Sequence, residues 1–184
     1  MGQLISLPDM RVLRPRFRDT VKLATFMEIY RYANDDKFLE SRELGEPFRN
    51  CYKYSPIHGN LLLNEGAAVI WEALTAATHG LFDEATARIQ VGTSATAEAD
   101  TQTALQGTVA SKAMDTGFPT IGGTGNDTVT FQSVFGSAEG NQAWNEFSVD
   151  NGAAEAVNLN RKVSAQGTKS SGQTWTIAIS IQAV

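Results

Sequence analysis

The sequence predicts an α+β protein that is mainly β: an antiparallel β-sandwich or jelly-roll-like body preceded by an extended arm and two helices. Three observations support this prediction. Apolar residues recur with a period of two in five segments after residue 85, the apolar spacing before that point is helical, and turn residues separate the later segments. Short strands with one apolar, buried face and one polar, solvent-exposed face are typical of antiparallel sheets, which pack as sandwiches or barrels.

At 184 residues the chain is long enough to bury a core of its own. We divide it into 1–56, an N-terminal arm and helix, and 57–184, a β-sandwich domain with one leading helix. Residues 1–19 are expected to be extended, because Pro8 and Pro15 interrupt a helix. The same segment carries four arginines, Arg11, Arg14, Arg16 and Arg18. It is either a solvated tail or an arm that becomes ordered by pairing these guanidinium groups with an acidic neighbour.

Residues 20–44 are predicted to form a helix that ends before Gly45 and Pro47. Its apolar stripe, at helical spacing, consists of Leu23, Phe26, Met27 and Tyr30. Residues 34–36 are weak helix formers, which favours a break into two shorter helices.

A second helix is predicted between Asn60, its cap, and Gly80. Its alanines keep it thin, so that it can lie close to a sheet. Gly66 costs about 1 kcal/mol relative to Ala in a helix. Such a cost is tolerable where another part of the chain packs tightly against the glycine.

The strands are predicted in five segments with alternating apolar residues, 85–92, 127–135, 143–149, 157–164 and 173–184. The core-facing residues of the three clearest segments are Ala87, Ile89, Val91, Val129, Phe131, Ser133, Phe135, Trp175, Ile177, Ile179 and Ile181. Of the three tryptophans, Trp71 and Trp175 are predicted to lie in the core. Trp144 alternates with Glu146 and Ser148, so we expect it to be exposed or at an interface.

Between the first two of these segments lies the stretch "GTSATAEADTQTALQG", residues 92–107, which has no evident chemistry. We expect a long crossing loop with one helical turn near Thr103 to Gln106. Leu105 is expected to anchor the loop on the sandwich. We expect this loop, with Leu105, to lie at or near a contact between subunits.

Charge is distributed unevenly along the chain. Residues 1–53 hold ten Lys and Arg against eight Asp and Glu, whereas residues 54–184 hold five against twelve, so the parts carry +2 and −7. The acidic body argues against nucleic acid as a general partner, because phosphate would be repelled. No run of about 18 apolar residues is present, which argues against a membrane partner. A lone Cys51 excludes an internal disulfide and fits synthesis in a reducing cytoplasm.

Residues with catalytic chemistry lack the spacing that catalysis needs. Neither histidine, His58 or His79, is followed by a second ligand at metal-binding spacing, and no G-x-S-x-G motif occurs. The glycine-rich "GGTGND", residues 122–127, lacks the Gly-Lys-Ser/Thr and the helix of a phosphate-binding loop and indicates a hairpin turn. We therefore expect no enzyme activity, no cofactor and no metal.

Several stretches resemble a family of small virion structural proteins of tailed bacteriophages over about residues 57–184. They are "GNLLLNEGAAVIWEAL", "ARIQVGTSATAEADTQTALQG", "NQAWNEFSVDNG", "NLNRKV" and "GTKSSGQTWTIAISI". The distinguishing features are the strand with "VGTS", the later "T-x-L-Q-G", the "W-N-E" strand, and the "N-R-K" strand followed by "T-K". Residues 1–56 show no such resemblance.

The resemblance implies a β-rich, non-catalytic particle component located in the virion. Our leading hypothesis is a capsid decoration, or cement, protein that sits on the head lattice as a homotrimer and binds the major capsid protein or other virion proteins. Arg14, Arg16 and Arg18 are the residues expected to attach it. One alternative is a tail, neck or fibre-attachment protein. Another is a glycan-binding module using Trp144 and the loops around Gly123 and Gly152.

Overall fold

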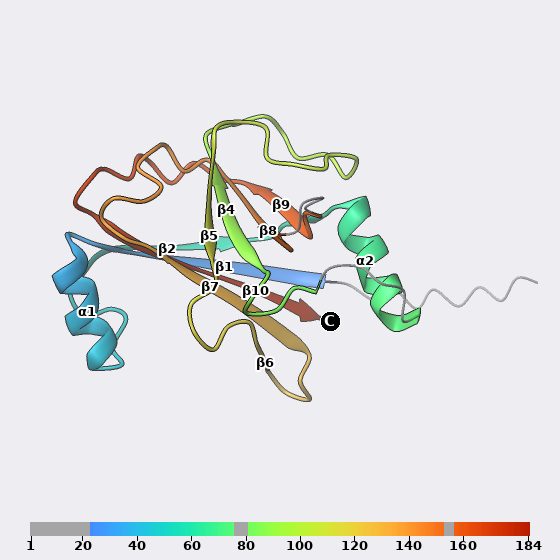
Figure 1. Ribbon diagram of the computed structural model, residues 1–184, viewed down its shortest axis with the longest axis horizontal. Coiled ribbons are helices and arrows are strands. Elements are labelled where there is room, and N and C mark those ends of the chain that lie inside the picture. The colour runs from blue at the N-terminus through green and yellow to red at the C-terminus, as the bar shows by residue number, and fades with distance from the viewer. Residues whose placement is uncertain (1–22, 76–80, 153–156) are drawn as a thin grey trace, which may run out of the picture.

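The computed structural model describes residues 23–75, 81–152 and 157–184, which form two five-stranded antiparallel sheets and two helices (Figure 1). The first sheet contains, in spatial order, β2 (Cys51–His58), β1 (Leu23–Tyr32), β10 (Thr174–Ala183), β7 (Thr128–Phe135) and β6 (Thr120–Gly122). The second contains β3 (Leu61–Leu62), β9 (Asn160–Val163), β8 (Glu146–Asp150), β4 (Arg88–Gly92) and β5 (Val109–Ala113). The predicted fold class, a mainly β sandwich, is confirmed.

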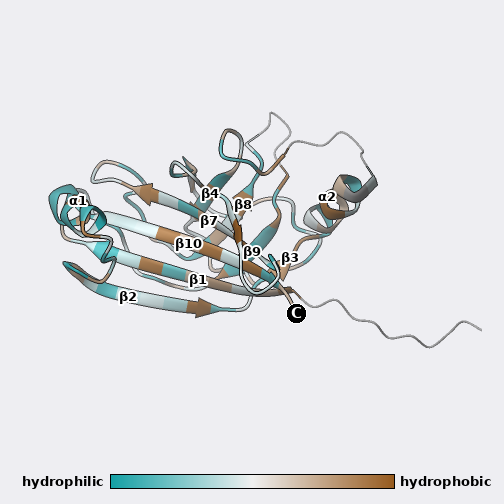
Figure 2. Cartoon of the chain, turned by 90° about the horizontal axis from the view of Figure 1, so that it is seen from below, coloured by the Kyte–Doolittle hydropathy of each residue, from teal (hydrophilic) through white to brown (hydrophobic). Residues whose placement is uncertain are grey.

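The two helices, α1 (Asp35–Glu43) and α2 (Asn64–Thr75), lie at opposite ends of the molecule (Figures 1 and 2). None of the described helices is long and apolar enough to cross a bilayer.

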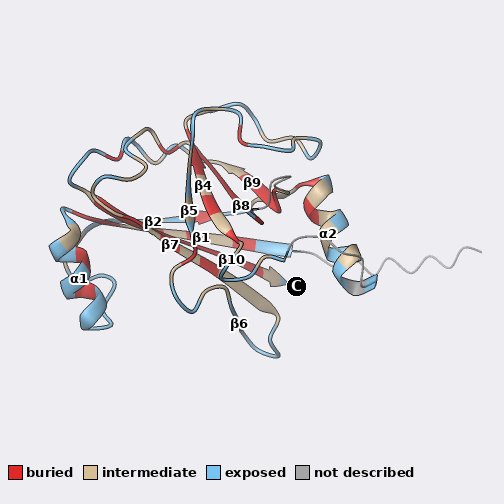
Figure 3. Cartoon of the chain, in the orientation of Figure 1, coloured by how far each residue is buried: buried red, intermediate tan, exposed pale blue. Residues whose placement is uncertain are grey.

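The core lies between the facing sides of the two sheets. Apolar and polar residues alternate along β7 and β10, and inward side chains of these strands such as Phe131, Phe135 and Ile177 are buried (Figures 2 and 3). The predicted core residues of the strands are confirmed except for Val129, which is only partly buried: Ile89, Val91, Ile177 and Ile179 have no exposed surface. Each such side chain contributes about 1.5–3 kcal/mol by leaving water.

The helix predicted over residues 20–44 is wrong for most of its described part, because Leu23–Tyr32 forms β1, between β10 and β2 in the first sheet. Strand pairing turns Met27 and Ile29 into the core and Phe26 and Tyr30 to the outer face. Both faces of β1 carry large apolar side chains, so its sequence does not show the period of two that predicts a strand.

Of the helix predicted over residues 20–44, only α1 forms. It begins at Asp35, within the segment 34–36 that was expected to break the helix. Asn34 is the N-cap, and its Oδ1 accepts the backbone N–H of Lys37 at 2.9 Å. Asp35 and Asp36 follow in the first turn, where negative charge is favoured. Residues 1–56, assigned to an arm and a helix, thus supply two strands of the first sheet.

The second predicted helix begins later than expected. Leu61 and Leu62 pair with β9, and α2 begins at Asn64, so Asn60 is not its cap. The end predicted at Gly80 lies outside the described residues. The prediction that Trp71 lies in the core is wrong, because 67% of its surface is exposed. Its first turn packs closely against Leu159, directly before β9, and the rest of the helix extends from one end of the body (Figure 1).

Candidate functional site

Of the residues predicted to make contacts, Arg11, Arg14, Arg16 and Arg18 lie outside the described residues. Leu105 is 7% exposed, so it is buried, as expected of a residue that anchors the crossing loop. The helical turn predicted nearby is absent, since no helix is assigned among residues 93–108. Whether Leu105 also lies near a subunit contact stays a prediction.

The prediction that Trp144 is exposed or at an interface is wrong, because the side chain is fully buried. Its ring packs edge-on against Phe135 and Trp175, each with centroids 4.9 Å away, and its Nε1–H donates to the Gly140 carbonyl at 2.9 Å. Its neighbour Glu146 is buried as well, so the polar alternation did not mark a wet face. A glycan-binding surface built on Trp144 is excluded.

Four of the sequence motifs meet at the buried carboxylate of Glu146. Its Oε1 accepts backbone N–H groups from Ser94 at 3.1 Å and Gly107 at 2.8 Å, and its Oε2 accepts that of Gln106 at 2.9 Å. Arg161 donates to Oε2 through Nε at 3.0 Å and Nη2 at 2.7 Å, and neither charged side chain is exposed. "VGTS", "T-x-L-Q-G", "W-N-E" and "N-R-K" therefore form one cluster.

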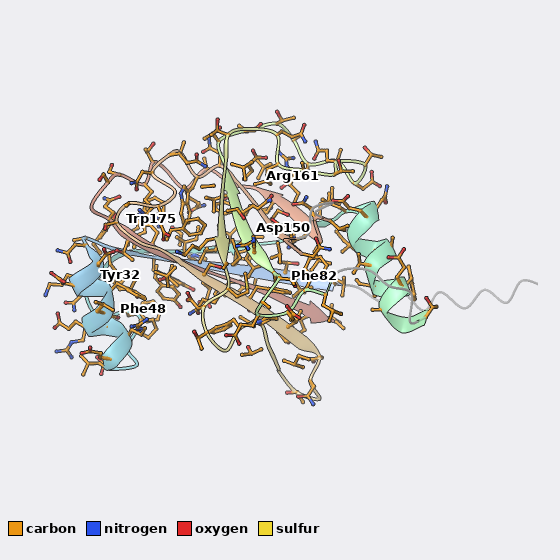
Figure 4. The ribbon with its side chains drawn as sticks, in the orientation of Figure 1. Tyr32, Phe48, Phe82, Asp150, Arg161 and Trp175 are labelled. Atoms are coloured by element: carbon orange, nitrogen blue, oxygen red, sulfur yellow. The ribbon has the colours of Figure 1, made fainter. Side chains whose placement is uncertain are left out.

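The same guanidinium holds the middle of the crossing loop. Arg161 donates to the Thr96 carbonyl at 3.0 Å, the Ala97 carbonyl at 3.3 Å and Gln102 Oε1 at 2.8 Å. Figure 4 shows Arg161 close to this loop, the yellow-green segment at the top of Figure 1.

The cluster is closed rather than open to a substrate. A Cβ at Gly92 would lie 2.5 Å from Glu146 Oε1, and one at Gly107 would lie 2.5 Å from the Ser94 nitrogen, so both motif glycines are needed for close packing. We conclude that the cluster fixes the loop in place. In the ranges that the structure describes, no group of three or more His, Cys, Asp or Glu is placed to hold a metal ion.

A cavity of about 220 Å³, here called the α1 cavity, lies between α1 and the outer face of the first sheet. Its deeper wall is made by buried Tyr32 and Thr176 of the sheet and Phe38 of α1, and its rim includes exposed Arg42 and Pro47. Figure 4 labels Tyr32 beside α1. A groove of about 390 Å³ adjoins the cavity and shares Phe38, Arg42 and a third lining residue, Asp115, with it.

Charged groups line this end of the molecule. Asp115 accepts the Gln132 Nε2–H at 3.1 Å and the Val134 N–H at 3.2 Å, yet burial raises the pKa of its carboxyl above the ordinary value. Across the groove, Lys112 is paired with Glu139. Opposite charges thus face one another along the groove.

Asp35 fastens the first turn of α1 to the loops beside the sheet. It accepts the Ser137 N–H at 3.0 Å, the Ser137 hydroxyl at 2.6 Å and the Thr174 hydroxyl. These hydrogen bonds, the one from the Ser137 side chain first, lower the pKa of Asp35. The N-terminal end of α1 is therefore a firmly placed wall of the groove.

An aromatic cluster formed by Tyr30, Phe48 and Tyr54 lies on the outer face beside the cavity, with ring centroids 5.0–5.3 Å apart. Both tyrosine hydroxyls donate to Glu28 Oε1, at 3.0 Å from Tyr30 and 2.7 Å from Tyr54. Burial, followed by the hydrogen bond to Glu28, raises the pKa of Tyr54 to about 12. Phe48 remains 62% exposed, so the cluster continues to the surface.

The second surface feature is α2, which is fixed at its first turn. The Asn64 N–H donates to the Asp100 carbonyl at 2.9 Å, and Glu65 Oε1 accepts the Asn158 N–H at 2.7 Å. Beyond this turn, Ile70 is 37% and Trp71 67% exposed. An anchored helix thus presents apolar side chains to its surroundings.

The sequence gives only part of the α1 cavity. Alternation along the strands placed Gln132 and Thr176 on an outer face, but not α1 above them, because β1 was predicted as part of a helix. Nothing in the spacing indicates Asp115, which follows β5 in the chain and joins Gln132 only in the folded sheet. No family model, no curated protein and no solved structure matches this chain.

Proposed function

We propose that this protein is a structural component of a tailed-bacteriophage particle, a decoration protein that binds the head lattice as a homotrimer and contacts the major capsid protein. The proposal rests on the sequence resemblance over residues 57–184 together with a surface suited to protein contacts. The closed Glu146 cluster supports it, because a long loop held by a buried ion pair presents a fixed shape to repeated neighbours.

The observation that carries the proposal is the apolar surface of α2. Its first turn is fixed to the body by two hydrogen bonds, and Gly66 lies so close to β9 that a Cβ would stand 2.1 Å from the Leu159 carbonyl oxygen. The same helix carries Trp71, and exposed tryptophans are enriched where proteins contact each other. In this proposal α2 docks on a neighbouring particle protein.

Copy number tests where in the particle the protein acts. Quantitative mass spectrometry of purified particles should find hundreds of copies of the chain per particle, as expected for a protein that covers a lattice. A count of a dozen or fewer would favour the alternative, a tail, neck or fibre-attachment protein. Absence of the chain from purified particles would contradict both.

Trp71→Ser tests the docking of α2. Because Trp71 is mostly exposed in the isolated chain, thermal unfolding should change little, while binding to particles that lack this protein should weaken at least tenfold if the side chain is a contact hot spot of about 2 kcal/mol or more. Ile121→Ser is the matched control, since Ile121 is 73% exposed on β6, away from α2. Equal losses in both variants, or none in Trp71→Ser, would contradict docking through α2.

A further inference from the structure

The α1 cavity contains a polar group without a partner. Thr176 is 7% exposed, and its Oγ1 has no hydrogen-bond partner among the described residues. Its side chain lines the cavity, on the outer face of β10. A buried hydroxyl left without a partner costs about 1–3 kcal/mol, so such groups are rare where nothing is bound.

Two further polar groups beside Thr176 have hydrogen-bonding capacity left. Gln132 uses its Nε2–H on Asp115, which leaves its amide oxygen as an acceptor. Arg42, on the rim, forms no ion pair with any described residue, and its guanidinium lies 5.4 Å from the centre of the Phe38 ring. The cavity thus offers donors and acceptors together.

The charges around the cavity favour a ligand that is itself neutral. A strongly anionic group would meet the carboxyl of Asp115, and a cationic group would meet the guanidinium of Arg42. Asp115 is half-buried, and this burial raises the pKa of its carboxyl above the ordinary value. A hydroxyl group on the ligand could donate to Asp115 and accept from Arg42 without either conflict.

Three aromatic side chains, beside Ser41, Gly45 and Pro47, form the rest of the lining. The hydroxyl of Tyr32 donates to the Pro47 carbonyl at 2.6 Å and that of Tyr30 donates to Glu28, so the two tyrosines line the cavity mainly with ring carbon. Phe38 of α1 forms a third aromatic wall. Ring faces with negative quadrupoles suit the weakly polarised C–H groups of a sugar ring.

We propose that the α1 cavity binds a neutral saccharide ring, with Thr176, Gln132, Asp115 and Arg42 contacting its hydroxyl groups and Tyr30 and Phe38 packing on its C–H faces. The adjoining groove of about 390 Å³ shares Asp115 and Arg42 with the cavity, so it provides room for a second linked ring. The site differs from a surface built on Trp144, and it does not depend on whether the chain is a particle component.

Protein-observed NMR titration tests the proposal directly. The full chain, labelled with 15N, is titrated with methyl glycosides of neutral hexoses and N-acetylhexosamines and with their linked disaccharides. We expect shift changes confined to residues that line the α1 cavity and the adjoining groove. Thr176→Val and Asp115→Asn should each weaken binding roughly tenfold, the loss expected for one hydrogen bond.

Thr120→Val is the matched control, because Thr120 is exposed on β6, on the same outer face but outside the cavity. The Thr120→Val variant should bind the saccharide with the affinity of the wild type. Thr176→Val removes a hydroxyl without a partner, so its thermal stability should not fall, and Asp115→Asn serves as an independent second variant. No shift with any probe, shifts located elsewhere, or wild-type affinity in both variants would overturn the proposal.

Discussion

The carboxylate of Glu146 and the guanidinium of Arg161 are 2.7 Å apart and fully buried. Removing one partner leaves the other charge buried without compensation, so Glu146→Gln should lower the free energy of unfolding by about 3–5 kcal/mol in urea denaturation. Arg161→Met should do the same, and the double variant should lose less than the sum of the two. Glu40→Gln, in an exposed ion pair, is the control and should leave stability unchanged. Additive losses in the double variant would contradict this coupling.

Asp35 should make stability depend on acid pH. Its pKa is lowered in the folded protein by the hydrogen bonds from Ser137 and Thr174, so its contribution is present above about pH 4, the ordinary pKa of Asp, and is lost as the pH falls through the lowered value. Asp35→Asn should lower stability by about 1 kcal/mol at neutral pH and by progressively less in acid.

Urea unfolding at a series of pH values measures this difference. Asp36→Asn is the matched control, because it removes the same charge from the neighbouring exposed position in the first turn of α1. Asp35 would have no such role if the gap between wild type and Asp35→Asn stayed constant from pH 7 to pH 3.

Trp144 shows why single residues were harder to place than strands. Exposure was inferred from its polar neighbours Glu146 and Ser148, but both are buried: Glu146 pairs with Arg161, and the Ser148 hydroxyl donates to Asn158 Oδ1 at 2.7 Å. These partners are 10 and 15 residues away in sequence. Local alternation predicts a wet face only when polar residues have no distant partner.

At the scale of elements, β4, β7 and β10 were predictable because one face is apolar and the other polar. β1 was not, since its outer face is covered by aromatic side chains and its inner face includes Arg31, which is buried with its guanidinium 4.4 Å from the centre of the Trp175 ring. The apolar residues of β1 then match helical spacing by chance. Only the pairing of β1 with β10 decides between a helix and a strand for this segment.

Gly66 in α2 was predicted to be tolerable only where something packs tightly, and the Leu159 carbonyl oxygen is the atom that does so. In an exposed helix, Gly66→Ala would gain about 1 kcal/mol. Here a Cβ would stand 2.1 Å from that oxygen, which also accepts the Leu63 N–H, so overpacking of about 1–3 kcal/mol should exceed the gain.

Chemical denaturation should therefore find Gly66→Ala less stable than wild type. Ala68→Gly, at an exposed position of the same helix, measures the propensity difference without a contact and should cost about 1 kcal/mol. A stabilised Gly66→Ala variant would mean that α2 can move away from β9, and its anchoring at the first turn would then not hold.

At the scale of the whole molecule, the resemblance depends on separate motifs, and the fold joins four of them at Glu146 although they are spread over residues 91–162. Their spacing in sequence could not show this, because the contacts join β4, β8, β9 and the crossing loop only after the second sheet has formed. The α1 cavity likewise needs residues from β1, α1, β7 and β10 together.

The proposed attachment to a capsid is also a property of the whole molecule, since it combines α2 with the arginines at Arg11, Arg14, Arg16 and Arg18. Weak contacts from several arms of one trimer would raise the local concentration to about the millimolar range, so each arm can bind weakly. Changing all four arginines to glutamine should leave the melting temperature of the body unchanged and abolish sedimentation with particles that lack this protein.

Deleting residues 1–19 should have the same effect, and the binding of the wild-type chain should weaken as salt rises from about 0.05 to 0.5 M, because the Debye length shortens to a few ångströms. The matched control changes Lys37, Arg42, Arg49 and Lys53 to glutamine, which removes the same charge from the described body. If this control lost binding as fully as the arm variant, net charge rather than the arm would hold the protein on the particle. Undiminished binding of the deletion variant would contradict attachment through the arm, and α2 would then remain as the proposed contact with the particle.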